Sequence, residues 1–426
     1  MELTILVVFI VGYLAIALEH PLKINKAAAA LITGVLCWTI YIFFAKEPNL
    51  VSGELIEHLG DIAGILFFLM GAMTIVELID AHDGFQVITS RIKTDNKRKI
   101  LWIITILTFF LSAVLDNLTT AIVMTSLSRK LISDRQERMI VLGMVIIASN
   151  AGGVWSPIGD VTTTMLWIGG RITANNIILK LFIPSVVCTL LPLLLFSLKI
   201  KGTEVREEFT ATTYRTTPFE RRFILATGIG ALLFVPVFKT VTHLPPFMGI
   251  LLGLGILWIL TEIMHLKKAD SYKSSFSVVN ALQKIDTPSI LFFLGILVAV
   301  AALQSTGMLS MFAVFLLRTI DNENAIVMML GLLSAIIDNV PLVAAAMGMY
   351  DLTIYPVDHF FWEFLAYCTG TGGSALIIGS AAGVAVMGME QMDFFWYVKR
   401  ITLYALLGYV AGALVYIAME PLFSPF

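Results

Sequence analysis

Two copies of one short motif place a carboxylate beside an amide inside apolar sequence. Asp116-Asn117 and Asp338-Asn339 each follow a Leu-Ser-Ala run with two further apolar residues. A charged side chain in the middle of a bilayer costs roughly 2.5–3.5 kcal/mol, so an acidic residue at that depth is by default an ion or proton site. Sites rich in oxygen that include carboxylates suit hard cations. The alternative is that both aspartates only cap helices.

Two glycine-rich segments form a second pair of motifs. Residues 148–160 contain Gly152-Gly153 and Pro157, and residues 368–380 contain Gly372-Gly373. Glycine pairs and proline interrupt helices, so both segments predict discontinuous spans with unpaired carbonyls that could bind a cation. Close helix packing at glycine is the alternative, although packing does not explain Asp160.

These motifs supply the candidate side chains for binding a cation or a proton. Glu77 is a candidate proton relay, or else a carboxylate at the membrane interface. His82 is expected on the surface of the loop that follows, and Glu363 near a span end is given no role. The candidate binding residues are Asp116, Asn117, Thr119, Thr120, Ser149, Asn150, Asp160, Thr162, Thr163, Asp338, Asn339, Thr371 and Ser374.

Transmembrane helices must hold these motifs. The chain has 426 residues, of which 58% are hydrophobic and 14% charged, with a mean hydropathy of +0.89. Soluble domains carry about 25% charged residues. Apolar runs along the whole length predict a polytopic, all-α membrane protein. The sequence lacks a phosphate-binding loop, a zinc motif and a nucleophile elbow in a fitting context, so we expect no enzyme, cofactor, nucleic-acid partner or ATPase subunit.

Ten full spans are expected in two series of five. Residues 1–18 lack a basic start and a cleavage site, so they are read as a first span and not as a signal peptide. Between the third and fourth span of each series lies an Asp-Asn segment, 100–128 or 324–350. The first series comprises 3–18, 27–44, 62–79, 139–170 and 177–198; the second comprises 222–239, 246–265, 288–316, 360–389 and 396–418; the polar linker 199–221 separates them.

Sequence matches between the series predict internal repeats, 1–198 and 222–426. Residues 65–68 match 290–293, and the Asp-Asn and Gly-Gly motifs recur in the same order at offsets of 220 to 222. The arms of the first Asp-Asn segment hold 16 and 11 residues. At 1.5 Å per residue they reach about 24 and 16 Å, short of a ~30 Å hydrocarbon core. A single crossing helix with aspartate in its middle is the alternative.

The distribution of basic residues favours hairpins over crossings. If both Asp-Asn segments are re-entrant hairpins and the N-terminus lies outside, 23 of the 28 Lys and Arg residues face the cytoplasm. If both segments cross, the split is 13 to 15. The positive-inside rule therefore predicts hairpins. Five crossings per repeat then make the two repeats inverted, with both tips near the midplane and both termini periplasmic.

At these motifs the sequence resembles the NhaD-type sodium/proton antiporters of bacteria, within the ion transporter superfamily. The matching stretches lie at 115–120, 149–153, 157–163, 338–341 and 370–374. The second tip departs from the first, with Pro341-Leu342 in place of Thr119-Thr120. The resemblance implies exchange of Na⁺ or Li⁺ for H⁺ in the bacterial inner membrane, an elevator-like movement, and a homodimer surrounded by lipid.

Within that resemblance, Na⁺ is expected at Asp116, Asn117, Asn150, Asp338 and Asn339. Asp116 and Asp338 are the carboxylates expected to bind Na⁺ and H⁺ in turn, with Asp160 in support. An ion-coupled carrier of an anion, dicarboxylate or arsenite, from the same superfamily is the alternative function. A dianion would be repelled by three aspartates at short range, so the cation antiporter ranks first. A channel or a receptor is a further alternative.

Overall fold

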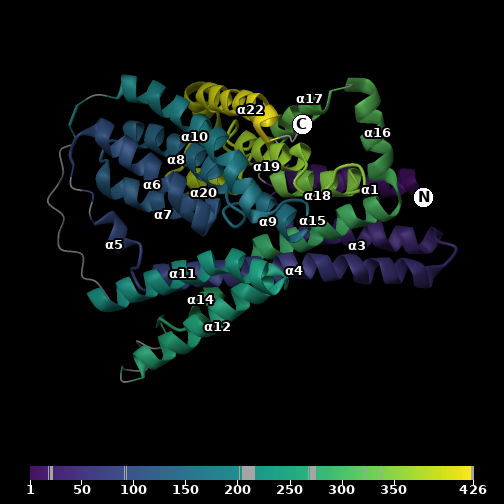
Figure 1. The fold of residues 1–426 in the computed structure, drawn as a ribbon, viewed down its shortest axis with the longest axis horizontal. Coiled ribbons are helices and arrows are strands. Elements are labelled where there is room, and N and C mark those ends of the chain that lie inside the picture. Colours follow the sequence, from purple (N-terminus) through teal and green to yellow (C-terminus); the bar gives the residue numbers. More distant parts are fainter. Residues whose placement is uncertain are drawn as a thin grey trace.

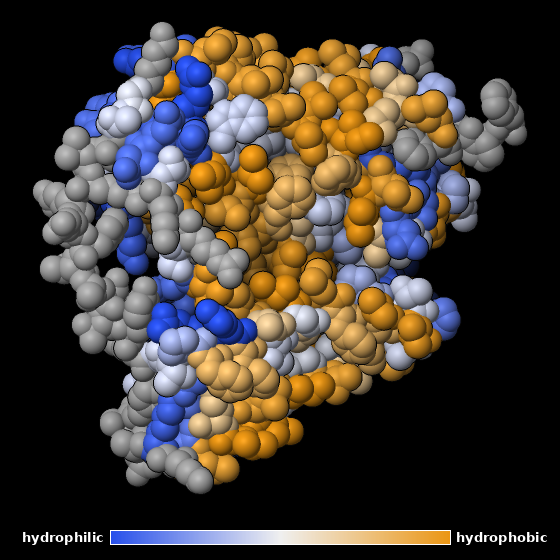
Figure 2. Space-filling view, turned by 60° about the vertical axis from the view of Figure 1, so that its left-hand side comes forward, coloured by the Kyte–Doolittle hydropathy of each residue, from blue (hydrophilic) through white to orange (hydrophobic). Residues whose placement is uncertain are grey.

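The computed structural model describes residues 1–17, 19, 23–90, 92, 94–200, 202–203, 216–266, 268, 275–320, 322–336 and 338–423, and it is built from helices (Figure 1). Within these residues nine helices are long and apolar enough to cross a membrane. Apolar residues form a broad surface between hydrophilic residues at two edges (Figure 2). The chain is therefore an all-α membrane protein, as the composition predicted.

Most helices lie within the expected spans, but α4 begins at Pro48, well before the expected start of the third span at 62. Most of the predicted linker 199–221 lies outside the described residues. In chain order the helices are α1 (Glu2–Ala17), α3 (Lys26–Phe44), α4 (Pro48–Ala81), α5 (Gln86–Thr89), α6 (Lys97–Leu115), α7 (Asn117–Leu131), α8 (Arg135–Val154), α9 (Val161–Ile168), α10 (Ala174–Lys199), α11 (Pro218–Thr242), α12 (Pro246–His265), α14 (Val278–Lys284), α15 (Thr287–Ser305), α16 (Met308–Ile320), α17 (Glu323–Leu333), α18 (Asn339–Met349), α19 (Phe360–Gly372), α20 (Ala381–Glu390), α21 (Phe394–Tyr397), the π-helix Val398–Thr402 and α22 (Leu403–Phe423).

Two expected spans are interrupted where the glycine-rich motifs lie. In the first, α8 ends at Val154 and α9 begins at Val161; in the second, α19 ends at Gly372 and α20 begins at Ala381. The side chain of Asp160 caps α9 and that of Ser380 caps α20. Each break therefore leaves a short, capped half-helix whose N-terminal amide groups face the interior of the protein.

The expected continuous span 288–316 is wrong. Helix α15 ends at Ser305, and α16 starts afresh at Met308. Between them Gly307 has φ +75°, a left-handed backbone that glycine adopts without steric cost and that ends a helix. A single glycine in an otherwise apolar run is a weak sequence signal, which is why the interruption was not expected.

Both Asp-Asn segments form antiparallel helix pairs. Lys97 at the start of α6 pairs with Glu137 at the start of α8 at 2.6 Å, and α8 begins four residues after α7 ends. The start of α6 and the end of α7 therefore lie at the same end of the molecule. Likewise Tyr355, just beyond α18, donates to Glu323 at the start of α17 at 2.8 Å. The turns of the two pairs fall at Asp116 and around Asp338.

The helices divide into two groups that Figure 1 separates. Helices α3, α4, α11, α12, α14 and α15 pack on one another, and we call them the scaffold group. Helices α6, α7, α8, α10, α17, α19, α20 and α22 form the hairpin group, which the drawing places above the scaffold group. Helix α18 contacts α15 of the scaffold group and α19 of the hairpin group.

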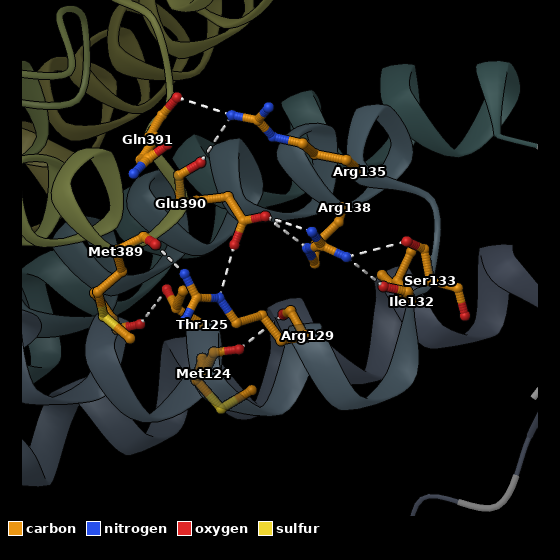
Figure 3. A network of polar contacts seen from close by, with 12 residues as sticks. Met124, Thr125, Arg129, Ile132, Ser133, Arg135, Arg138, Met389, Glu390 and Gln391 are labelled. Atoms are coloured by element: carbon orange, nitrogen blue, oxygen red, sulfur yellow. Dashed lines mark hydrogen bonds and ion pairs between the residues drawn. The ribbon is translucent and has the colours of Figure 1, made fainter. Parts of the chain in front are cut away.

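A buried carboxylate joins three helices of the hairpin group (Figure 3). Glu390, 5% exposed at the end of α20, accepts from Arg129 of α7 at 2.8 Å and from Arg138 of α8 at 2.5 Å. Arg135 of α8 donates to the backbone carbonyl groups of Glu390 and Gln391 at 3.2 and 3.1 Å. This Glu390 network fixes one arm of the first helix pair against both interrupted spans.

Candidate functional site: an acidic cavity between two helix turns

One small cavity is lined by aspartates and asparagines from both halves of the chain. Its volume is about 60 Å³. Five of the predicted site residues contribute to its wall, together with Lys26, Ser289 and apolar side chains of α4, α15 and α18. These five are Asp116, Asn117, Asp160, Asp338 and Asn339. The two turns that the sequence singled out therefore meet at one cavity, although they are more than 200 residues apart.

Asp116 forms the turn between α6 and α7. Its backbone has φ +87° and ψ 156°, a conformation that costs a non-glycine residue of order 1–3 kcal/mol and is found most often at functional sites. Its two carboxylate oxygens accept from the backbone N–H and the hydroxyl of Thr119, both at 2.8 Å. Among the described residues, Thr120 Oγ1 is buried with no hydrogen-bond partner.

A chain of amide hydrogen bonds connects this turn to both interrupted spans. Asn117 Nδ2 donates to Asp160 Oδ1 at 2.7 Å and to Asn150 Oδ1 at 3.1 Å. Asn150 Nδ2 in turn donates to the hydroxyls of Ser374 and Ser380, each at 2.9 Å. The sequence predicted four of these five side chains but did not single out Ser380. Its position as the cap of a half-helix, equivalent to Asp160, was the signal that could have found it.

The remaining predicted hydroxyls bind within the protein. Thr162 donates its hydroxyl to Asp160, and its backbone N–H lies 3.1 Å from the same carboxylate. Thr163 faces the Val154 carbonyl at 3.5 Å, and Thr371 donates to the Tyr367 carbonyl at 2.6 Å. Ser149 donates to the Ile146 carbonyl at 3.0 Å. Thr162 and Thr163 thus bond at the interruption between α8 and α9, whereas Ser149 and Thr371 bond to the preceding turn of their own helices.

The second turn carries a partner that the sequence reading missed. Asp338 caps α18 by accepting from the backbone N–H of Val340 at 3.2 Å. Its other oxygen, Oδ2, lies 3.4 Å from the ammonium group of Lys26, the first residue of α3. The sequence analysis counted Lys26 only as one of the 23 Lys and Arg residues expected to face the cytoplasm. Because the two residues are 312 positions apart, no spacing in the chain could have linked them.

A larger cavity of about 540 Å³ adjoins the acidic one. Lys26, Asp338 and Leu118 contribute to the walls of both. Its polar lining residues also include Glu19, which follows α1, and Asn25, Asp286 and Ser289 at the starts of α3 and α15. This larger space provides a path from the molecular surface to the second turn.

The structure limits how a cation could be held. Among the described residues, no group of three or more His, Cys, Asp or Glu side chains lies close enough to bind a metal ion. A cation in the acidic cavity therefore needs amide, hydroxyl or backbone oxygens in addition to a carboxylate. Glu77 contributes to neither cavity wall and pairs instead with Lys284 of α14 at 3.3 Å.

His82, which was expected at the surface, and Glu363, which was given no role, are both buried. His82 is 0% exposed; its ring stacks on His265 with centroids 5.2 Å apart, and its Nδ1 lies 2.7 Å from the Leu78 carbonyl. Burial lowers the pKa of His82 below its usual value, because an imidazolium would lose its hydration. Glu363 is also 0% exposed and pairs with Lys180 at 3.1 Å. The expectation for His82 was wrong because sequence position beside a span end does not reveal which neighbouring helices cover a side chain.

The sequence is similar to known membrane transport proteins. A family model described as CitMHS, Citrate transporter, matches residues 5–362. Sodium/proton antiporter 1 of Arabidopsis thaliana is 47% identical over 423 residues, which cover 99% of this chain and 73% of that protein. Sodium/proton antiporter 2 of the same plant is 45% identical, with 97% and 98% covered. The Na(+)/H(+) antiporter NhaD of Alkalimonas amylolytica is 28% identical, with 96% and 89% covered.

These matches extend over both helix groups and both turns. Membrane-crossing helices around a buried polar cavity, with such relatives, place the protein among the membrane transporters. The chain belongs to the citrate transporter family and, within it, to the NhaD-type sodium/proton antiporters.

Proposed function

We propose that this protein exchanges Na⁺ or Li⁺ for H⁺ across a membrane. The observation that carries the proposal is the single cavity that Asp116, Asp160 and Asp338 line together. Carboxylates enclosed in one small space repel one another, so each gains from taking up either a proton or a metal cation. A carboxylate that binds either a proton or a metal cation, but not both at once, is sufficient in principle to couple the exchange of the two.

The charge of the cavity argues for a cation over an anion as the transported species. Three aspartates face one lysine on the cavity wall. A dianion in this space would be opposed by a net negative charge at short range. The family description names citrate, so carriage of a carboxylate anion is the second candidate, and Lys26 is the one observation in its favour.

We further propose that the two halves are inverted repeats with re-entrant hairpins, α6–α7 and α17–α18. Equivalent contacts in both halves support this. Ser112 of α6 donates to the Ser149 carbonyl at 2.5 Å, and Ser334 after α17 donates to the Thr369 carbonyl at 2.7 Å. Helices α17 and α18 have 11 residues each, about 16 Å long, which is too short to cross a ~30 Å core. Helix α6 has 19 residues, more than the 16 expected, and is one of the nine described helices long enough to cross, so length supports the hairpin in the second half only.

In this mechanism Na⁺ and H⁺ are substrates and no cofactor takes part. Na⁺ entering from one side displaces protons at Asp116 and Asp338, and protons displace Na⁺ on the other side. Asn117, Asn150 and Asn339 supply amide oxygens, and Asp160 balances charge. The hairpin group moves against the scaffold group, in the manner of an elevator, to change which side has access. A homodimer in lipid, in the inner membrane of a bacterium with both termini periplasmic, remains our proposal for its setting.

Transport in proteoliposomes tests the function. We expect an imposed Na⁺ gradient to drive proton movement, and we expect Asp116→Asn and Asp338→Asn each to abolish it. Asp351→Asn, which changes an exposed aspartate outside both cavities, serves as the matched control. Labelled citrate and succinate in the same vesicles test the second candidate. Normal exchange by both cavity variants would show that these two carboxylates are not part of the mechanism. Citrate uptake without sodium exchange would replace the antiporter proposal with anion transport.

A further inference from the structure

Lys26 is a positive charge placed at the boundary between the two helix groups. It is the first residue of α3 in the scaffold group, and its ammonium group lies 3.4 Å from Asp338 at the second turn. The same nitrogen lies 4.4 Å from the centre of the Phe292 ring of α15. The Lys26 side chain lines both the acidic cavity and the larger one that adjoins it.

The backbone beneath Lys26 is held firmly against α15. Helices α3 and α15 meet at glycines: a Cβ added to Gly34 would lie 2.7 Å from the Gly295 carbonyl oxygen, and one added to Gly295 would overlap the backbone of α3. Asn25 caps α3 by accepting from Ala27 N–H at 2.8 Å. Phe292 is fully buried. The ammonium group is therefore presented to Asp338 from a fixed base.

Helix geometry alone does not favour a lysine at this position. The N-terminal end of a helix carries a partial positive charge, which repels a cation placed there. The carboxylate of Asp338 and the face of the Phe292 ring offset that repulsion. Lys26 is thus stabilised by the same carboxylate that the exchange mechanism needs for sodium.

The two turns are therefore electrostatically different. Both oxygens of Asp116 accept from the neutral groups of Thr119, whereas one oxygen of Asp338 faces a full positive charge. A sodium ion that approaches Asp338 meets the ammonium group of Lys26 at close range. Because the two cations repel each other, contact of both the sodium ion and the Lys26 ammonium group with this carboxylate is energetically unfavourable.

We propose that Lys26 is a built-in competitor of sodium for Asp338. It pairs with Asp338 while that carboxylate carries neither sodium nor a proton, and it separates from the carboxylate when sodium binds. Lys26 thereby sets the sodium affinity, and its release removes a polar tie between α3 of the scaffold group and the turn before α18. The inference rests on the proposed sodium/proton exchange.

The test measures sodium dependence in purified protein with and without the charge. We expect Lys26→Gln to lower the apparent KM for Na⁺ by about three- to tenfold, a range that allows for the partial exposure of the pair. Lys26→Arg keeps the charge and should stay near the wild-type KM. Lys23→Gln removes an exposed charge from the same segment and is the matched control, expected to leave KM unchanged.

A second readout does not depend on transport. The Na⁺ concentration that gives half-maximal thermal stabilisation in detergent should fall by the same factor in Lys26→Gln. An unchanged or higher value in both assays, or an equal change in Lys26→Arg and Lys26→Gln, would overturn the inference. If Lys26→Gln does not fold, Lys26→Met takes its place in both assays. If neither variant folds while Lys26→Arg does, the positive charge is needed for folding, and the inference is overturned.

Failure of the proposed function can be recognised separately. It would appear as wild-type protein that moves no protons in response to sodium. In that case the thermal assay still decides whether sodium binds and whether Lys26 opposes it. If the wild type exchanges sodium and only the Lys26 prediction fails, the exchange mechanism stands without a competing lysine.

Discussion

Replacing Glu390 with glutamine removes a negative charge that joins α7, α8 and α20. The carboxylate is 5% exposed, whereas the Arg138 and Arg129 side chains are 15% and 44% exposed. Glutamine keeps the size of the side chain but leaves two guanidinium groups facing a neutral amide. The expected result is a loss of stability in the hairpin group together with slower exchange.

The magnitude follows from which group is left without its partner. Removing one member of a buried ion pair costs roughly 3–5 kcal/mol when the remaining charge is fully enclosed. Here Arg129 can turn toward water and Arg138 keeps the carbonyls of Ile132 and Ser133, so we expect about 2 kcal/mol for Glu390→Gln. Arg129→Gln removes a half-exposed partner and leaves Glu390 paired with Arg138, so its cost should stay below about 1 kcal/mol.

Thermal unfolding in detergent and exchange in proteoliposomes measure the two effects. Ala381, at the start of α20, lines the acidic cavity, and Glu390 lies nine residues farther, about 14 Å along the helix. Glu390→Gln should therefore lower the maximal exchange rate and leave the KM for Na⁺ near the wild-type value. A larger loss of stability in Arg129→Gln than in Glu390→Gln would refute the reasoning, as would a Glu390→Gln protein of wild-type stability and rate.

Two further predictions concern packing and pH. A Cβ at Gly372 would overlap the backbone carbonyl of Gly331 in α17, so Gly372→Ala should lower the free energy of unfolding by about 1–3 kcal/mol and impair exchange. Gly388 has open space around it, so the control Gly388→Ala should fold and exchange normally. Equal thermal midpoints for the two variants would contradict this prediction. Burial lowers the pKa of His82, so below about pH 6.5 the unfolded chain binds a proton that the folded protein refuses. Stability should thus fall as the pH drops below that value, and His82→Gln should show a shallower fall in thermal unfolding from pH 7 to 5; identical slopes would exclude this contribution.

Much of the fold and part of the site could be predicted from local chemistry. Apolar length identifies a span, because only a helix satisfies its own backbone hydrogen bonds within lipid. Gly152-Gly153 and Gly372-Gly373 marked the interruptions, because glycine weakens a helix at its own position. The Asp-Asn pairs stood out because a carboxylate in apolar sequence needs a compensating role. Each of these signals lies within a few residues of the feature that it predicts.

The amino-acid sequence by itself thus determined a helical membrane protein with two repeated acidic turns. Only the tertiary structure decided that Asn117 bridges Asp160 and Asn150, that Lys26 faces Asp338, and that α12 covers His82. The physical reason is that hydropathy gives the same signal for a side chain buried in lipid and one buried in protein. Which charges meet in the interior depends on how whole helices pack, and that packing brings together residues hundreds of positions apart.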